Sequence, residues 1–91
     1  MTLLMTRIQV EDYDAWKPVF DEGRETIRAQ AKGHRVCRSV EDPNEVFIAV
    51  EFGSPDDARE AVSRLKGSGA LDRVTVKSGP AIVEEAESLT Y

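Results

Sequence analysis

Residues 35–52, RVCRSVEDPNEVFIAVEF, decide the fold because they predict two strands joined by a turn. In the second strand, 46–52, successive side chains point to opposite faces of a sheet. Both sets are apolar: one is Val46, Ile48, Val50 and Phe52, and the other is Phe47 and Ala49. A hairpin with one face in water would carry polar residues there. Both faces of this hairpin are therefore expected to be covered.

The turn of the hairpin has its own chemistry. Asp42, Pro43 and Asn44 favour a type I turn, in which Asp at the first position binds the backbone and Pro presets φ at the second. Pro43 excludes the type I′ turn that two-residue hairpins prefer, because that turn needs a positive φ. Because the usual two-residue turn is excluded, the sequence does not determine which residues of the two strands pair.

Before the hairpin, the sequence predicts a strand over 3–10 and a helix over 11–32, with Gly33 as the residue after its last turn. Asp12 or Asp14 can cap the helix, and because Pro18 is best tolerated near a helix start, residues 12–16 can instead form a separate turn. An apolar stripe follows helical spacing: Trp16, Val19, Phe20, Gly23, Ile27 and Ala31. Arg24 and Arg28 are expected on the opposite, solvated side.

After the hairpin, the clearest helix signal is Ser54 as N-cap, Pro55 in the first turn and Gly67 after the last. Residues 68–79 are ambiguous, and we favour a short helical turn at 70–74, although Val74 and Val76 also fit a strand. The last strand is expected from residue 80, with Ile82 and Val83 apolar on opposite faces.

The predicted order of elements is β-α-β-β-α-β, which is typical of an α+β, ferredoxin-like fold: a four-stranded antiparallel sheet with both helices on one face. The chain has 91 residues, of which 41% are hydrophobic and 32% charged, so one domain over 1–91 is expected. Residues 88–91 form a polar tail that is either flexible or in contact with a partner.

Composition excludes several classes of protein. The net charge is −5 and the basic residues are scattered, which argues against nucleic-acid binding. We expect a cytoplasmic protein without a membrane partner, because no apolar run is long enough to span a bilayer and no signal peptide is recognisable. One cysteine, Cys37, and one histidine, His34, cannot build a cysteine cluster or a site of several imidazoles, so no metal is expected.

The two-sided strands predict a partner. Two helices can cover one face of the sheet, and the other must meet a ligand layer or another sheet. A second copy of the chain, related by a two-fold axis, covers it most simply because each subunit buries the same patch. A homodimer is therefore the expected state.

Three stretches also resemble a known family: VEDYDAWKPVFDE at 10–22, DPNEVFIAVEF at 42–52 and SPDDARE at 54–60. They are similar to the small dimeric α+β barrel proteins of the antibiotic-biosynthesis-monooxygenase superfamily, over nearly the whole chain. The resemblance implies a homodimer with a small-molecule cleft between sheet and helices. It implies no single reaction, because the family includes cofactor-independent oxygenases, heme-handling enzymes and cyclase-like proteins.

The cofactor-independent relatives imply a dry pocket with a few polar groups. Trp16 and Phe20 are the candidate aromatic wall, and Tyr13 is a candidate hydrogen-bond donor. Arg38 is a candidate anion partner and His34 a candidate acid or base. No cofactor is expected, since His34, the one candidate heme ligand, is predicted to lie away from the helices.

Each candidate has a structural alternative. Trp16 can be core, Tyr13 can cover the helix start, and His34 can be solvated. Arg38 is expected to pair with Glu51, the one charged residue inside the second hairpin strand, although Glu51 and Arg38 can both instead meet a ligand. Cys37 is expected to be a small buried hydrophobe.

Two functions follow from these observations. The first is a homodimer that binds a small aromatic or polyketide-like molecule, with oxygenase or cyclase activity. The second is a non-catalytic ligand-binding or dimerisation protein. The first predicts a cavity beside Trp16 and Phe20 that a polar residue such as Arg38 or His34 also lines, and the second predicts that these side chains are packed solid.

Overall fold

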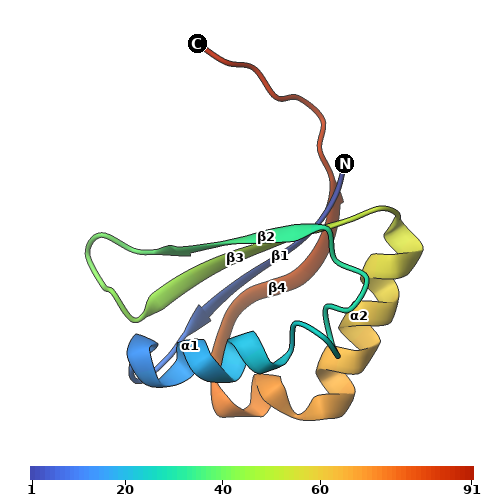
Figure 1. Cartoon of the computed structure of the whole chain (residues 1–91). Coiled ribbons are helices and arrows are strands. Elements are labelled where there is room, and N and C mark those ends of the chain that lie inside the picture. Colours follow the sequence, from blue (N-terminus) through green and yellow to red (C-terminus); the bar gives the residue numbers. More distant parts are fainter.

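A computed structural model describes all residues, 1–91. One antiparallel sheet has the strand order β2-β3-β1-β4, and both helices lie on the same side of it (Figure 1). This confirms the predicted ferredoxin-like α+β fold. The elements are β1 (Thr2–Gln9), α1 (Tyr13–Glu22), β2 (Gly33–Arg38), β3 (Glu45–Phe52), α2 (Pro55–Ser68), the 3-10 helix η1 (Ala70–Arg73) and β4 (Thr75–Glu84).

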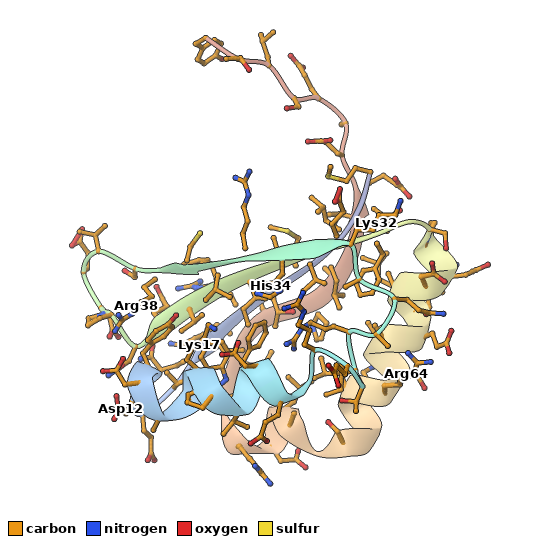
Figure 2. All side chains as sticks on the ribbon, in the orientation of Figure 1. Asp12, Lys17, Lys32, His34, Arg38 and Arg64 are labelled. Atoms are coloured by element: carbon orange, nitrogen blue, oxygen red, sulfur yellow. The ribbon has the colours of Figure 1, made fainter.

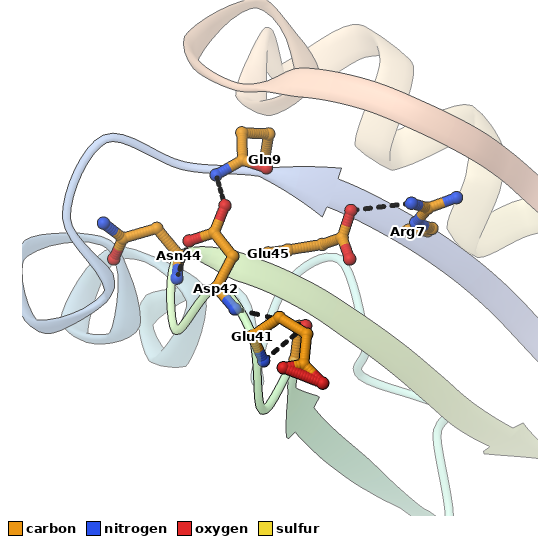
Figure 3. Close-up of polar contacts among 7 residues, drawn as sticks. Arg7, Gln9, Glu41, Asp42, Asn44 and Glu45 are labelled. Carbon is orange, nitrogen blue, oxygen red and sulfur yellow. Dashed lines mark hydrogen bonds and ion pairs between the residues drawn. The ribbon is translucent and has the colours of Figure 1, made fainter.

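The hairpin turn is built as its sequence predicts. The Glu45 N–H donates to the Asp42 carbonyl at 3.0 Å, and the Asn44 N–H donates to the Asp42 carboxylate at 2.9 Å. Figure 3 shows a second link, in which Gln9 Nε2 donates to Asp42 Oδ2 at 3.0 Å and joins the tip to β1. In the structure, the pairing of the two hairpin strands places Val36 opposite Ile48.

The core lies between the sheet and α2. It contains nine buried side chains: Leu4, Ile8, Val10, Val46, Ile48, Val50, Phe52, Ala58 and Ala61. All four even-numbered residues of β3 belong to it, as the alternation predicts. In β1, Thr2 and Thr6 take the remaining inward positions and are buried as well.

The opposite face of the sheet, which we call the outer face, carries a second apolar set. It comprises Leu3, Met5, Phe47, Ala49, Ala81 and Val83. Met5, Phe47 and Val83 are 43%, 41% and 38% exposed, because no element of the chain covers them. Val83 lies opposite Leu3 on this face, while Ile82 lies opposite Leu4 on the inner one. The prediction of two-sided strands is confirmed.

The first helix is much shorter than predicted. It ends at Glu22, residues 23–30 form a series of turns, and Gly33 begins β2 instead of following a helix. The Gly23 N–H turns back to the Phe20 carbonyl at 3.1 Å, and Arg28 Nη2 donates to the same oxygen at 2.6 Å. The carbonyl at the helix end is thus satisfied by a side chain, and Arg28 is buried instead of solvated.

The second half of the chain follows prediction with shifted boundaries. Ser54 caps α2 as expected, but the helix continues to Ser68, and Gly69, with φ of 75°, ends it in place of Gly67. Residues 70–73 form the predicted helical turn. The strand after it begins at Thr75 instead of residue 80. The helical spacing and the strand alternation that made this segment ambiguous therefore belong to two successive elements, η1 and β4.

Two further observations complete the fold. Cys37 is exposed on the outer face, so the prediction of a buried thiol is wrong: β2 is an edge strand with no layer over that side. Beyond β4 the C-terminal residues extend away from the domain, with Leu89 68% exposed (Figure 1). No helix of this structure has the length and apolar character needed to cross a membrane.

Candidate functional site

The helix α1 stands away from the sheet. None of its residues is buried, whereas α2 buries Ala58 and Ala61 against the strands. A cleft of about 580 Å³ lies between α1, the inner face of the sheet and α2. Most of its lining is apolar and includes Leu4, Ile8, Trp16, Phe20, Ile48 and Val50. The polar part of the lining includes Thr6 and Arg28, together with Glu11, Asp12, Glu22 and Arg73.

A row of aromatic rings runs along α1 and reaches β2. The centroids of Tyr13 and Trp16 are 5.8 Å apart, and those of Trp16 and Phe20 are 5.0 Å apart. The row continues to His34, whose ring meets Phe20 edge-on at 5.2 Å and 87°. Because helical residues three and four apart share a face, the spacing 13, 16, 20 places these rings side by side.

Of the three rings on α1, the first and the last are each covered by a guanidinium group. Arg38 Cζ is 3.9 Å from the Tyr13 ring centroid, and Arg28 Cζ is 3.8 Å from that of Phe20. Arg38 also donates from Nε to the Pro43 carbonyl at 2.8 Å, which ties the hairpin loop to the helix start. Both arginines therefore hold aromatic rings in place through cation–π contact.

The hairpin loop positions the start of α1. Asp12 is the N-cap, and its Oδ1 accepts from the Asp14 N–H at 3.1 Å. Asn44 contributes both ends of its amide: Oδ1 accepts from the Tyr13 N–H at 2.9 Å, and Nδ2 donates to the Glu11 carbonyl at 3.1 Å. The helix is thus anchored at its first residue by the loop and at its end by Arg28, while Trp16 and Phe20 between them are only partly buried against the core.

His34 faces the helix side of the sheet, at the mouth of a second hollow. Desolvation, followed by the positive charges of Arg28 and Lys17, holds the pKa of His34 below its ordinary value, and Asp21 opposes that shift. The imidazole is therefore mainly neutral at pH 7 and can accept a proton. The second hollow has a volume of about 560 Å³, and its lining includes Arg24, Arg28, Lys32 and His34.

The structure brings five of the six predicted site residues together. Trp16 and Phe20 line the cleft, and Tyr13, His34 and Arg38 complete the row of stacked side chains. His34 touches a helical residue, contrary to the expectation that it lies away from the helices. The cleft also differs from expectation in its polar lining, which includes Arg28 but neither Arg38 nor His34.

Glu51 stands apart from these residues. The register pairs Glu51 with Gly33 and Arg38 with Val46, so the two charged side chains lie at opposite ends of the hairpin. They also lie on opposite faces, because Glu51 is outward and Arg38 inward. The predicted Arg38–Glu51 pair is therefore wrong, and Arg38 meets Tyr13 and Pro43 instead.

Sequence reasoning missed Arg28. It was assigned to a solvated helix face because the apolar stripe was read as one helix through residue 31. Gly23 was the available signal, since a glycine inside a helical pattern can mark a helix end. Burial of Arg28 lowers its pKa from the ordinary value, although a guanidinium remains charged at any physiological pH.

Metal-binding chemistry has no recognisable donor set. Nowhere in residues 1–91 do three or more His, Cys, Asp or Glu side chains come together in a way that could hold an ion.

Comparison with known proteins identifies the fold. No family model matches the chain, and no curated protein matches it. A solved structure from Chloroflexus aurantiacus J-10-fl, named "putative Antibiotic biosynthesis monooxygenase", superposes with a TM-score of 0.68 at 14% sequence identity. The match covers 98% of this chain and 96% of that one. The two proteins share a fold over nearly their whole lengths.

Proposed function

We propose that this protein is a homodimer of the antibiotic-biosynthesis-monooxygenase-like superfamily that binds a small aromatic or polyketide-like molecule in the cleft under α1. The observation that carries the proposal is the cleft itself, with a volume of about 580 Å³ and an apolar lining that includes Trp16 and Phe20. Small-molecule sites are typically apolar hollows of this size with a few polar groups. The superfamily is supported by the resemblance of residues 10–22 and 42–60 and by the shared fold.

The cleft suits an aromatic ligand better than a polar one. The Trp16 and Phe20 rings offer a flat apolar wall, and the inner face of the sheet offers Leu4, Ile48 and Val50. Offset or edge contacts between aromatic rings contribute about 0.5–1.5 kcal/mol beyond area burial. Polar groups make up the smaller part of the lining, and they include Thr6 on the sheet and Arg28 from the segment after α1.

An oxygenase reaction in such a cleft needs little from the protein. A substrate that forms a stabilised carbanion can supply all the electrons: a ring CH2 and O2 give a ring carbonyl and water. His34 and Arg38 do not line the cleft, but they touch rings of the α1 row, Phe20 and Tyr13 respectively. A substrate that extends past Phe20 would reach the His34 imidazole, the proposed base, and Arg38 is the proposed anion partner at the Tyr13 end. The side chains of the cleft would orient the substrate and exclude water.

The dimer is supported by the outer face. Its apolar residues include Met5 and Phe47, each more than 40% exposed, and they lie on adjacent strands. At one end Arg7 Nη2 donates to Glu45 Oε2 at 2.7 Å (Figure 3). Arg7 also lies over Phe47, with Cζ 5.4 Å from the ring centroid. An apolar centre with a polar rim is typical of a protein interface.

Ligand binding can be measured directly, because Trp16 is the only tryptophan of the chain. A panel of dihydroxynaphthalenes and anthrones should quench its fluorescence with saturation. Val19→Glu places a charge on the cleft lining and should weaken binding about tenfold, whereas Val40→Glu, at a residue that is 95% exposed in the hairpin loop, should not. If no member of the panel gives saturable quenching, the proposal is contradicted.

Oxygen consumption separates the enzyme from a non-catalytic binding protein. The panel is incubated with oxygen and without added cofactor. An enzyme should turn over at least one member, and His34→Ala or Arg38→Ala should reduce turnover while Trp16 quenching persists. If at least one member binds saturably but none is turned over, the result favours the alternative, a ligand-binding dimer without catalytic activity.

A further inference from the structure

The second hollow has a chemistry that the cleft does not explain. Its lining includes three cations, Arg24, Arg28 and Lys32, but only one carboxylate, Glu25, and His34 closes one side. In Figure 2 Lys32 lies at the start of β2 and His34 between β2 and α1. The chain as a whole carries a net charge of −5, so this concentration of positive charge runs against its overall composition. We call these residues the basic hollow.

None of the three cations forms an ion pair with a carboxylate, although the charge of Asp21 acts on Arg28 from a greater distance. The five ion pairs of the structure involve other basic groups: the N-terminus, Arg7, Lys17, Arg59 and Arg64. Arg24 and Lys32 are exposed, and Arg28 is only 9% exposed. Unpaired like charges repel one another, and a bound anion would relieve that repulsion.

Arg28 is the residue that points most strongly to a ligand. Its Nη2 is used by the Phe20 carbonyl, but its Nε is buried and has no hydrogen-bond partner. The Nε of Arg7 is in the same condition, but Arg7 is paired with Glu45, whereas Arg28 has no carboxylate partner. A buried, charged donor without an acceptor costs free energy. Native structures rarely leave such a group without a partner, and a bound anion is one group that would satisfy it.

Arg28 also connects the two hollows, because it lines both. Its guanidinium covers Phe20, whose ring forms part of the cleft wall. A ligand lying against Trp16 and Phe20 therefore reaches Arg28 at the rim. Any anionic group attached to that ligand would meet Arg28 first, with Arg24 and Lys32 beyond it.

We propose that the basic hollow binds the oxyanion of an amphiphilic ligand whose aromatic body lies in the cleft, which makes the ligand an aromatic or polyketide-like acid. A carboxylate matches the planar fork of a guanidinium. This inference rests on the proposed ligand binding in the cleft, and it adds an acidic group to the expected ligand.

Two fluorescent probes test the charge requirement while keeping the aromatic body nearly constant. One is 1-anilinonaphthalene-8-sulfonate, and the other is the uncharged N-phenyl-1-naphthylamine. At low ionic strength the wild-type protein should bind the sulfonate at least fivefold more tightly than the neutral probe. The difference should shrink in 0.5 M NaCl, since exposed charges are screened by salt.

A double variant with a matched control locates the effect. Arg24→Gln with Lys32→Gln removes the two exposed cations of the basic hollow, and should weaken sulfonate binding about tenfold while changing neutral-probe binding less than twofold. Arg59→Gln with Lys66→Gln removes one arginine and one lysine from the exposed side of α2, and should change neither. Equal losses for both probes, or an equal loss in the control, would overturn the proposal.

Inorganic phosphate tests the basic hollow without the cleft. In an NMR titration it should shift the amide signals of residues 24–34 and raise the pKa of His34, whose ring signals are unique because the chain has one histidine. The Arg24→Gln, Lys32→Gln variant should lose both responses. If neither probe binds but phosphate does, the cleft proposal fails and the anion site stands. If neutral-probe binding occurs without sulfonate preference or phosphate response, the anion site fails alone.

Discussion

At the scale of single residues, Gly79 shows how closely β4 approaches β1. Its φ is 82°, and a Cβ added there would lie 2.4 Å from the Met5 carbonyl oxygen. The register between the two strands shifts next to this point, as is typical where a glycine allows an irregularity in a strand. Only glycine fits both the backbone angle and the space.

Gly79→Ala should therefore destabilise the protein by at least about 2 kcal/mol, from a strained φ and a steric clash. Gly67→Ala is the matched control, because Gly67 lies inside α2 and a Cβ there meets nothing within 4 Å. It should stabilise by about 0.5–1 kcal/mol through helix propensity. Urea unfolding of the three proteins measures both, and equal effects of the two substitutions would contradict the prediction.

His34 predicts a pH dependence of stability. Because its folded-state pKa is lowered, the unfolded chain binds the proton more readily below its ordinary pKa of about 6.5. Its contribution to stability is therefore constant above that pH and falls as the pH drops through it. Urea midpoints at pH 8 and pH 5 should differ less in His34→Gln than in the wild type. An unchanged difference would show that the His34 pKa is not lowered.

At the scale of elements, α1 is defined by what holds its two ends. Asn44 anchors the first residue from the hairpin loop, and Arg28 anchors the last turn from the segment that follows. Between these anchors the helix contributes no buried residue. The cleft depends on this arrangement, since a helix packed directly on the sheet would fill it.

Asn44→Ala should loosen the start of α1. It removes the acceptor for the Tyr13 N–H and the donor to the Glu11 carbonyl, and should cost about 1–2 kcal/mol. Asn44→Asp keeps the acceptor and should retain part of that stability. Hydrogen exchange at Tyr13 should accelerate most in the alanine variant. Unchanged exchange there would show that the loop does not anchor the helix.

Arg28→Met tests the other anchor. The substitution keeps an unbranched apolar stem as far as the position of Nε but removes the hydrogen bond to Phe20 and the cation–π contact. Together these should cost about 1–3 kcal/mol. Arg35→Met, at an exposed position of β2 without these contacts, should have little effect. Comparable losses in the two variants would contradict a specific role for Arg28.

At the scale of the whole molecule, the outer face is the feature that the chain leaves uncovered. A stable two-fold interface buries about 800 Å² per partner, which requires most of one face of a small sheet. The apolar centre formed by Met5, Phe47 and Val83 is the candidate patch. The tail after Glu84 leaves the domain beside it, and contact of that tail with a partner remains a prediction from the sequence.

Phe47→Glu should convert the proposed dimer into a monomer, because it places a second carboxylate within the apolar patch that the dimer would bury. Light scattering at micromolar concentration should show about twice 10.1 kDa for the wild type and 10.1 kDa for the variant. Val40→Glu, remote from the patch, should remain dimeric. A monomeric wild type would refute the dimer.

Most of the fold could be predicted, and about half of the candidate site. The order of elements, the caps at Asp12 and Ser54 and the turn at Asp42 depend on residues within a few positions of one another. Tyr13, Trp16 and Phe20 share a face for the same local reason. Arg28, Arg38 and Glu51 were misjudged because their surroundings depend on where the chain turns and on the register of the hairpin.

The sequence by itself determined that the sheet is apolar on both faces, because alternation along a strand is a local geometric property. It thereby predicted that one layer of helices would leave an apolar face of the sheet uncovered. Only the tertiary structure decided that α1 ends at Glu22, that Arg28 folds back over Phe20, and that a cleft and a basic hollow meet at that side chain. The physical reason is that burial of a charged group depends on contacts between distant segments, which no local pattern encodes.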